Sequence, residues 1–362
     1  MIRVAVVGAG GFVGARMIEM AQLRGGVLDG CELVPVVRRY RGLGRLARLG
    51  PLAYRMADAS KPETLREAFA GCDVVVNLTM GDDSRIAPDV ANLFEACARS
   101  GISCFIHFSS AEVFGRCDRP RLSDDSDWQR DHWMAYAREK GRAEDWLRRV
   151  PAGEGPSVVT LRPGLVWGPR SSWVAGPAQA IRDGAAFLFD GGRWACNLCY
   201  VDNLAYAVTA VARGQARESG FYNIGDPDRP DWRGYYLGLA AKLGMTEPAF
   251  RELDAAEYRE SLADRLIAVK RHRALGWLRR RLRSSTKQAV NHRILVLRRA
   301  FSPPLEHYVP ALQVGKGMWW LQTTRYLLPT SKFQEVFKPT QLSFREGLER
   351  TGAWLRFAGF AS

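Results

Sequence analysis

A tyrosine, a lysine and a serine have the types and spacing best suited to acid–base chemistry in this sequence. Tyr136 precedes Lys140 by four residues, so both side chains lie on one face of a helix, about one turn apart. An isolated tyrosine has a pKa of about 10, and a neighbouring ammonium group lowers that pKa by favouring the phenolate. Ser110 ends an apolar run and can hold the reacting oxygen. The three residues predict a general acid–base site for a secondary alcohol or ketone.

A glycine-rich turn near the start of the chain predicts phosphate binding. The β-branched run at residues 2–7 is typical of a buried strand, and Gly8, Gly11 and Gly14 lead from it into a helix expected at residues 15–23. Glycines here permit a tight turn, a close approach of backbone to pyrophosphate, and close packing of helix on strand. The helix N-terminus offers N–H groups to the phosphates. We expect dinucleotide binding; the alternative is a glycine-rich turn without a ligand.

The end of the second expected strand, residues 32–37, indicates which dinucleotide binds. An acidic residue at about this place bonds the ribose 2′-hydroxyl of NAD, whereas an arginine accommodates the 2′-phosphate of NADP. Here Arg38 and Arg39 follow the strand, with Arg41 nearby and no acid. The pattern favours NADP(H). NAD stays the alternative, because arginines at strand ends are also common as solvated residues.

Strands and helices alternate along the first part of the chain. Further strands are expected at residues 54–57, 73–78, 103–109 and 197–201, and helices at 62–70, 89–100, 204–212 and 232–243. This alternation predicts an α/β fold, a Rossmann-type doubly wound parallel sheet with right-handed crossovers, with a smaller C-terminal substrate domain.

Composition places the chain among soluble globular proteins. It has 362 residues, of which 47% are hydrophobic and 25% charged, and no apolar run approaches the ~20 residues that span a bilayer. The chain enters a strand at once, so we expect no signal peptide. Seven scattered cysteines favour a reducing cytoplasm. Cys196 and Cys199 form a C-x-x-C that we interpret as ordinary strand residues, with a redox or metal role as the alternative; no metal site is expected.

Several motifs in a fixed order carry a family resemblance. They are Gly8-x-x-Gly11-x-x-Gly14, the strand end at 74–80 with Asn77, HFSSAEVFG at 107–115, Tyr136-x-x-x-Lys140, LRPGLVWGP at 161–169, YVDNLAYAV at 200–208, and FYNIGD at 221–226. The chain resembles an extended short-chain dehydrogenase/reductase of the NAD(P)-dependent epimerase/dehydratase type. The resemblance covers about residues 1–245 and resumes as a short pattern at 339–354.

The resemblance implies roles for individual residues. Tyr136 would be the catalytic acid/base, Ser110 would hold the reacting oxygen, and Lys140 would bond the nicotinamide ribose and tune Tyr136. The residues it implies for cofactor binding are Gly8, Gly11, Phe12, Val13 and Gly14 at the pyrophosphate, Arg38 and Arg39 at the 2′-phosphate, Asp58 at the adenine, Asn77 at the ribose and Pro163 at the nicotinamide. For Asp58 and Asn77, a helix cap and a turn residue are equal alternatives. Family members are often homodimers through a helix pair that would include the Tyr136 helix.

Three departures from the family pattern narrow the chemistry. Sugar-nucleotide dehydratases carry Thr-Asp-Glu where this chain has Ser110-Ala111-Glu112, so one acid is missing and dehydration is disfavoured. Sugar-nucleotide epimerases usually carry an Asn at the place of Gly164 and an Arg near Cys196 to clamp a diphosphate, and neither is present. The Arg-Pro-Gly form of the 161–169 motif also resembles hydroxysteroid dehydrogenases and ketoreductases.

We divide the chain into three parts. Residues 1–170, completed by about 196–226, form the dinucleotide-binding domain, 171–195 and 227–262 the substrate-binding lid region, and 263–362 a basic helical extension. The aromatic residues expected to line the lid, with a core role as the alternative, are Trp173, Phe187, Phe189 and Trp194.

The net charge of +14 is concentrated in one segment. Residues 265–300 hold twelve Lys or Arg and no acid, and the rest of the chain is close to neutral. Two short amphipathic helices with a solvated basic face are one interpretation. Peripheral contact of 265–301 with an anionic membrane surface is another. Nucleic-acid binding is not expected, because no recognition module accompanies the charge.

The expected activity is reversible hydride transfer at a secondary alcohol or ketone carbon. A sugar or sugar conjugate, acted on by a reductase or epimerase, is the first substrate hypothesis. A dehydrogenase or reductase of a lipophilic, steroid- or polyketide-like alcohol at the membrane surface is an alternative, and a non-catalytic NADP-binding subunit is another. The expected location is the cytoplasm, with the inner face of the membrane as the alternative.

Overall fold

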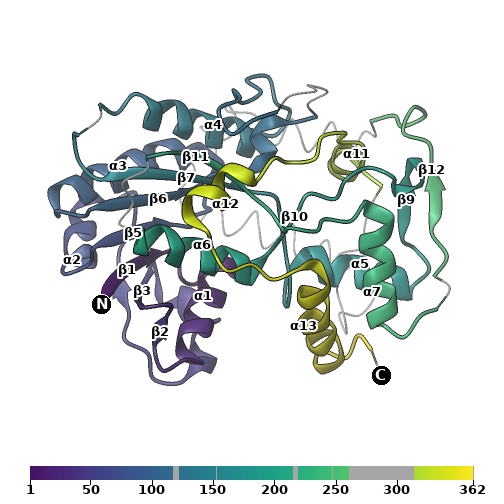
Figure 1. Cartoon of the computed structure of the whole chain (residues 1–362), viewed down its shortest axis with the longest axis horizontal. Coiled ribbons are helices and arrows are strands. Elements are labelled where there is room, and N and C mark those ends of the chain that lie inside the picture. The colour runs from purple at the N-terminus through teal and green to yellow at the C-terminus, as the bar shows by residue number, and fades with distance from the viewer. Residues whose placement is uncertain (117–121, 152, 215–218, 247, 261–313, 362) are drawn as a thin grey trace, which may run out of the picture.

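A computed structural model describes residues 1–116, 122–151, 153–214, 219–246, 248–260 and 314–361 (Figure 1). Its main sheet has eight strands in the order β11-β7-β6-β5-β1-β3-β2, with β4 paired to β3. The strands are β1 (Ile2–Val7), β2 (Val27–Leu28), β3 (Cys31–Val37), β4 (Arg55–Met56), β5 (Val74–Asn77), β6 (Cys104–Phe108), β7 (Ser157–Pro163) and β11 (Gly220–Ile224). Every pair is parallel except β2 with β3, which confirms the predicted doubly wound α/β fold.

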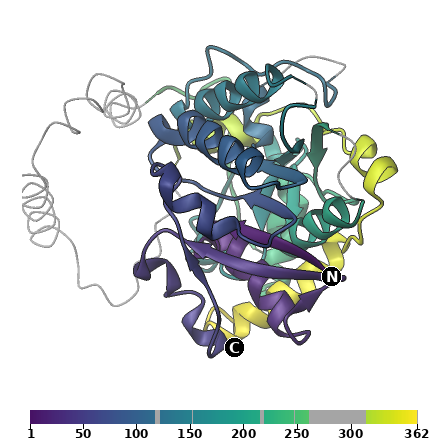
Figure 2. The same cartoon turned by 90° about the vertical axis from the view of Figure 1, so that its left-hand side faces the viewer.

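Helices cover both faces of this sheet (Figures 1 and 2). They are α1 (Phe12–Gln22), α2 (Leu65–Phe69), α3 (Ile86–Arg99), α4 (Ala135–Arg148) and α6 (Val201–Arg213). Successive residues of β1 point to opposite faces, so Val4 and Val6 join the core beneath α1 and α6, while Ala5 and Val7 join the core beneath α2, α3 and α4. Burial on both faces explains why this strand is apolar throughout.

A smaller set of elements packs beside the sheet. It comprises β8 (Leu165–Trp167), β9 (Phe187–Phe189), β10 (Leu198–Tyr200), β12 (Arg251–Leu253), α5 (Ser172–Arg182) and α7 (Trp232–Lys242). Short 3₁₀ turns connect the elements of both parts: η1 (Tyr40–Leu43), η2 (Ala47–Leu49), η3 (Pro62–Thr64), η4 (Asp83–Arg85), η5 (Ala111–Phe114) and η6 (Asp190–Gly192).

The predicted last strand of the main sheet, residues 197–201, is wrong in its pairing. Those residues form β10, but β10 pairs with β8 in a separate two-stranded sheet, and β11 is the edge strand beside β7. Gly164 explains the difference, because the chain leaves the main sheet there. A Cβ at Gly164 would lie 2.1 Å from the carbonyl oxygen of Asn197, so only glycine lets the chain beyond β7 approach the strand that becomes β10.

The C-terminal segment runs across the molecule, as the yellow ribbon in Figure 1 shows. It forms α11 (Lys316–Gln322), which packs beside β9, α12 (Ser331–Phe337), which packs on β11 and α6, and α13 (Phe344–Phe357), which packs on α7. The basic segment 265–301 and its expected helices lie outside the described residues. Among the described helices, none has the length and apolar character that crossing a bilayer requires.

Candidate active site

The structure brings Ser110, Tyr136 and Lys140 together at the carboxyl edge of the sheet. Ser110 follows the end of β6, and its hydroxyl shares a hydrogen bond with the phenol of Tyr136, the second residue of α4. Lys140 lies one turn further along α4, with its Nζ 5.9 Å from the centre of the Tyr136 ring. The Nζ donates a hydrogen bond of 2.6 Å to the carbonyl oxygen of Phe108.

The expected lowering of the Tyr136 pKa is wrong in this structure. Burial raises the pKa of Tyr136 to about 12, although the hydrogen bond with Ser110 lowers it, and the charges of Glu112 and Asp83 raise it further. Burial also lowers the pKa of Lys140 to about 8, against an opposing effect of Glu144. The Nζ of Lys140 donates to the carbonyl oxygen of Phe108, and among the described residues no hydrogen bond joins it to the phenol of Tyr136. At pH 7 the phenol is neutral, so it is a proton donor.

A buried ion pair behind the site is a feature that the sequence analysis missed. The side chains of Arg162 and Glu144 are both fully buried. The Nε and Nη2 atoms of Arg162 donate hydrogen bonds to the Glu144 carboxylate at 2.9 and 2.5 Å. The same carboxylate accepts a hydrogen bond of 2.5 Å from Ser109. The pair thus joins β7, α4 and the end of β6, the three elements that position the candidate catalytic residues. Glu144 follows Lys140 by four residues on the same helix face, a spacing that could have drawn attention to it.

The glycine turn has the geometry that a pyrophosphate needs. Gly8 has a φ of +95°, and a Cβ there would lie 3.1 Å from the backbone of Leu78. A Cβ at Gly14 would lie 2.6 Å from the carbonyl oxygen of Gly8, so α1 packs directly on the turn. Gly11 is the N-cap residue of α1, and the helix begins at Phe12, three residues earlier than predicted.

The N-terminus of α1 is open for a ligand within the described structure. No side chain caps it, and its first turn, which includes Phe12 and Val13, contains no acid. The N–H groups of this turn would therefore bond the pyrophosphate of a dinucleotide, with the positive end of the helix dipole beside it. The residues present fit that group.

Arg38 and Arg39 lie at the carboxyl end of β3, on the other side of β1 from β5. Both are exposed, and neither side chain makes a hydrogen bond or ion pair with any residue that the structure describes, although the carbonyl oxygen of Arg39 accepts a hydrogen bond from the N–H of Gly42 at 2.8 Å. They lie near Asp58. Burial raises the pKa of the Asp58 carboxyl, but the hydrogen bonds from Ser60 and the charges of the two arginines lower this pKa by more, so that it lies below its usual value. The Asp58 carboxylate accepts hydrogen bonds from both the N–H and the hydroxyl of Ser60, at 3.0 and 2.8 Å. These bonds form a turn, and the alternative of a helix cap given for Asp58 does not hold for the 3₁₀ turn that follows, since the N-cap residue of η3 is Lys61.

Asn77 and Pro163 end strands on either side of β6. Asn77 is buried, and its side-chain oxygen accepts hydrogen bonds from the N–H and hydroxyl of Thr79 at 3.0 and 2.7 Å, so it shapes the turn after β5. Its amide nitrogen lies 3.3 Å from Nδ1 of His107. Pro163 is the last residue of β7 and pairs in register with Ile224. Both residues lie at the edge where a nicotinamide would bind.

An aromatic cluster joins the residues just before α4 to a distant part of the chain. Trp133 and His132 precede α4, and Trp320 of α11 packs on both, with ring centres 6.2 and 5.2 Å away. Arg116 lies over the ring of Trp319, 4.3 Å from its centre. The indole N–H groups of Trp133 and Trp320 are buried and have no hydrogen-bond partner among the described residues.

Three of the four aromatic residues that were expected to line a substrate lid lie in or against the core instead. Phe187 and Phe189 are buried in the core, which agrees with the alternative given for them, and α11 packs against their strand. Trp173 and Trp194 are half-buried, and the indole of Trp194 bonds Asp190 at 3.3 Å. The aromatic residues that pack on His132 and Trp133 instead come from α11, which the sequence analysis assigned to an extension.

The C-x-x-C cysteines are buried far from solvent. Cys196 and Cys199 are both free, and burial raises the pKa of each thiol well above its usual value. Across the described parts of the chain, no three His, Cys, Asp or Glu side chains are grouped as metal ligands.

A family model decides the classification. The model of the NAD dependent epimerase/dehydratase family matches residues 4–225. The chain belongs to this family.

Curated relatives include reductases and an epimerase. A 2-alkyl-3-oxoalkanoate reductase of Shewanella oneidensis is 28% identical over 57% of this chain and 56% of its own length. A 4-hydroxy-2-methyl-3-oxo-4-farnesyl-3,4-dihydroquinoline-1-oxide ketoreductase of Stigmatella aurantiaca is also 28% identical, over 62% of this chain and 69% of its own. An N-acetyl-alpha-D-glucosaminyl-diphospho-ditrans,octacis-undecaprenol 4-epimerase of Escherichia coli O157:H7 is 24% identical, over 63% and 68%. The chain thus spans only about half the length of the first of these relatives.

Solved structures share the fold over the whole chain. A dTDP-glucose 4,6-dehydratase of Bacillus anthracis in complex with NAD superposes with a TM-score of 0.67 at 15% identity, covering 100% of this chain and 99% of the other. At this identity the likeness shows the fold alone.

Proposed function

We propose that this protein is an NADP(H)-dependent reductase of a ketone carried on a lipophilic substrate. The observation that carries the proposal is the Ser110–Tyr136 hydrogen bond beside Lys140, at the sheet edge where the glycine turn lies. Burial raises the pKa of Tyr136 to about 12, so the phenol is neutral at pH 7 and can donate its proton to a forming alkoxide.

Each residue has a separate part in the proposed reaction. Ser110 donates a hydrogen bond to the ketone oxygen and orients it toward Tyr136. The Tyr136 phenol gives its proton to that oxygen as the carbon accepts hydride. Lys140, held by Phe108, binds ribose hydroxyls and restores the proton to Tyr136. When bound, the nicotinamide supplies the hydride.

The preference for NADP(H) rests on Arg38 and Arg39. Both are exposed at the carboxyl end of β3, and within the described residues their guanidinium groups make no hydrogen bond or ion pair, although Asp58 lies near them, so they are available for a 2′-phosphate. NAD remains the alternative cofactor, and the neighbouring carboxylate of Asp58 is the group that would favour it.

The aromatic cluster supports a lipophilic substrate. Trp133 precedes Tyr136 by three residues and packs against Trp320, which packs against Trp319. In the proposed complex these rings supply apolar surface, and the indole N–H groups of Trp133 and Trp320, which have no partner among the described residues, are donors for a second substrate oxygen. Relatives named as reductases of a 2-alkyl-3-oxoalkanoate and of a farnesylated quinoline act on ketones of this kind. The missing diphosphate clamp at Gly164 and Cys196 points the same way.

A second candidate is an epimerase or reductase of a sugar conjugate. It is favoured by the relative named as a 4-epimerase of an undecaprenol-linked N-acetylglucosamine, whose lipid could also use the aromatic cluster. The same three residues would act, with the ketone turning over before hydride returns. We also propose a homodimer through α3 and α4, which pack side by side along one face of the sheet.

Cofactor titration tests the proposal. NADPH and NADH are titrated by fluorescence at fixed salt into wild type, Arg38→Ala, and a control, Arg99→Ala, whose exposed arginine ends α3 at the opposite edge of the sheet. We expect wild type and the control to bind NADPH at least about tenfold tighter than NADH, and Arg38→Ala to lose this preference. Equal binding of NADH by wild type would overturn the NADPH assignment.

Turnover then separates the two candidates. A reductase oxidises NADPH stoichiometrically when given a 2-alkyl-3-oxoalkanoate or a related lipophilic ketone. An epimerase retains its cofactor through purification and interconverts a sugar conjugate with no net oxidation. The second result would replace the reductase proposal with the epimerase.

A further inference from the structure

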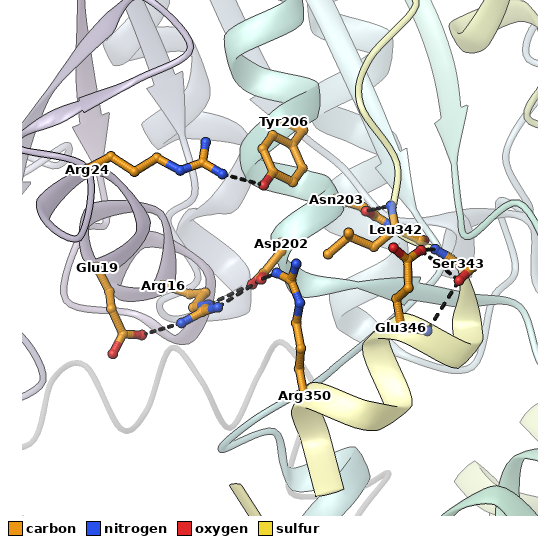
Figure 3. Close-up of polar contacts among 10 residues, drawn as sticks. All are labelled: Arg16, Glu19, Arg24, Asp202, Asn203, Tyr206, Leu342, Ser343, Glu346 and Arg350. Carbon is orange, nitrogen blue, oxygen red and sulfur yellow. Dashed lines mark hydrogen bonds and ion pairs between the residues drawn. The ribbon is translucent and has the colours of Figure 1, made fainter. Parts of the chain in front are cut away.

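One buried carboxylate joins three distant parts of the chain. Asp202, in the first turn of α6, is completely buried and accepts hydrogen bonds from Arg16 of α1 through Nε at 2.6 Å and Nη2 at 2.8 Å. The same carboxylate accepts a hydrogen bond of 3.0 Å from Nη1 of Arg350, in α13 (Figure 3). Because Asp202 lies at the N-terminus of α6, the helix dipole also stabilises its negative charge.

Arg16 lies close to the proposed pyrophosphate site. It follows Gly14 by two residues on the helix whose N-terminus faces the phosphates. Gly14 packs against the backbone of Gly8 and Ala9, so a small displacement of α1 also displaces the turn. The remaining Nη1 of Arg16 donates to Glu19 at 2.9 Å, which leaves the guanidinium fixed between two carboxylates (Figure 3).

The start of α13 is held by the residue after Asp202. The side chain of Asn203 donates to the carbonyl oxygen of Leu342 at 3.0 Å and accepts from its N–H at 2.8 Å. Ser343 and Glu346 then form a capping box that starts α13 (Figure 3). A Cβ at Gly347 would lie 2.9 Å from Tyr200, so α13 lies close against the end of β10. These contacts set the position from which Arg350 reaches Asp202.

We propose that Arg350 is a positioning residue for cofactor binding, acting through Asp202 and Arg16 on helix α1. In this arrangement α13 holds α6, and α6 holds the helix that binds the pyrophosphate. The inference concerns the dinucleotide site of the family and needs no assumption about the substrate. By reciprocity, a bound dinucleotide also stabilises the docking of α13.

The test compares two variants of α13 contacts in the full chain. Arg350→Met removes the contact with Asp202 and keeps an unbranched apolar stem. The control, Lys242→Met, removes the ion pair between Lys242 and Glu349, 2.6 Å long, which joins α13 to α7 without involving Asp202. NADPH and NADH affinities are measured by fluorescence titration, together with the melting temperature and hydrogen exchange of the amides at residues 12–16.

We expect Arg350→Met to weaken dinucleotide binding about fivefold and to speed exchange in α1, while Lys242→Met leaves both within twofold. The inference is wrong if Arg350→Met leaves affinity and exchange unchanged, or if both variants alter them equally, which would indicate a general loosening of α13. Hydrogen exchange of the α1 amides is measured without cofactor, and the change in affinity can be measured with either NADPH or NADH. A failure of the NADPH preference is therefore distinct from a failure of this inference.

Discussion

Replacing Arg162 by methionine should destabilise the protein more than any exposed arginine replacement. The guanidinium of Arg162 meets the carboxylate of Glu144 where both side chains are completely buried, and its Nη1 donates to the carbonyl oxygen of Asp124 at 2.7 Å. Methionine removes the positive charge and leaves Glu144 with the hydroxyl of Ser109 as its remaining hydrogen-bond donor among the described residues.

The magnitude follows from the burial of the carboxylate that is left. Breaking a buried ion pair on one side costs about 3–5 kcal/mol, because the remaining charge loses its partner without regaining water. This is a large part of the roughly 5–15 kcal/mol by which a domain is stable. A variant that removes both charges, Glu144→Leu with Arg162→Met, should recover part of the loss, because the carboxylate left by the single variant is gone, while the buried Lys140 loses the negative charge that favours its ammonium form.

Denaturant unfolding of wild type, the single variant and the double variant measures these differences. The single variant should also lose catalytic activity, because Glu144 helps to hold Ser109 and α4. A loss of less than about 1 kcal/mol for Arg162→Met, or a double variant no more stable than the single one, would refute the reasoning.

Two further predictions concern ionisation and catalysis. Burial raises the pKa of Asp226 to about 6, against hydrogen bonds from Tyr200, Trp167 and Asn203, so its protonated form is favoured by folding. Relative to Asp226→Asn, the unfolding free energy of wild type should therefore rise by up to about 3 kcal/mol as pH falls from 7 to 4, and parallel pH profiles would contradict this. Tyr136→Phe should lower kcat by about 100-fold or more while the dinucleotide Kd changes less than about threefold; an active variant would exclude Tyr136 as the proton donor.

Local patterns predicted most of what positions the site. The strand at residues 2–7, its glycines and the first helix are adjacent in sequence, so their arrangement follows from local geometry. Tyr136 and Lys140 share a helix face for the same reason, and Ser110 meets them because parallel strands end at one edge of the sheet. These relations need no knowledge of distant packing.

What the sequence analysis missed depends on contacts between distant residues. The pKa of Tyr136 rises because of burial, a quantity that spacing does not contain. Trp320 reaches His132 from a segment almost two hundred residues downstream. The sequence around Trp320 contains no motif that links this residue to His132. The edge strand of the sheet was misplaced because the chain leaves the main sheet at Gly164, so that β10 pairs with β8 and β11 becomes the edge strand.

The clamp around Asp202 also sets an order of events during synthesis. Asp202 can meet Arg16 as soon as α6 has left the ribosome, but Arg350 is translated 148 residues later. In that interval the nascent chain can fold its sheet, while the surfaces of α6 and α7 that α13 will cover remain open to water. A chaperone or protease that recognises those surfaces would therefore act on the growing chain and lose its target once α13 docks.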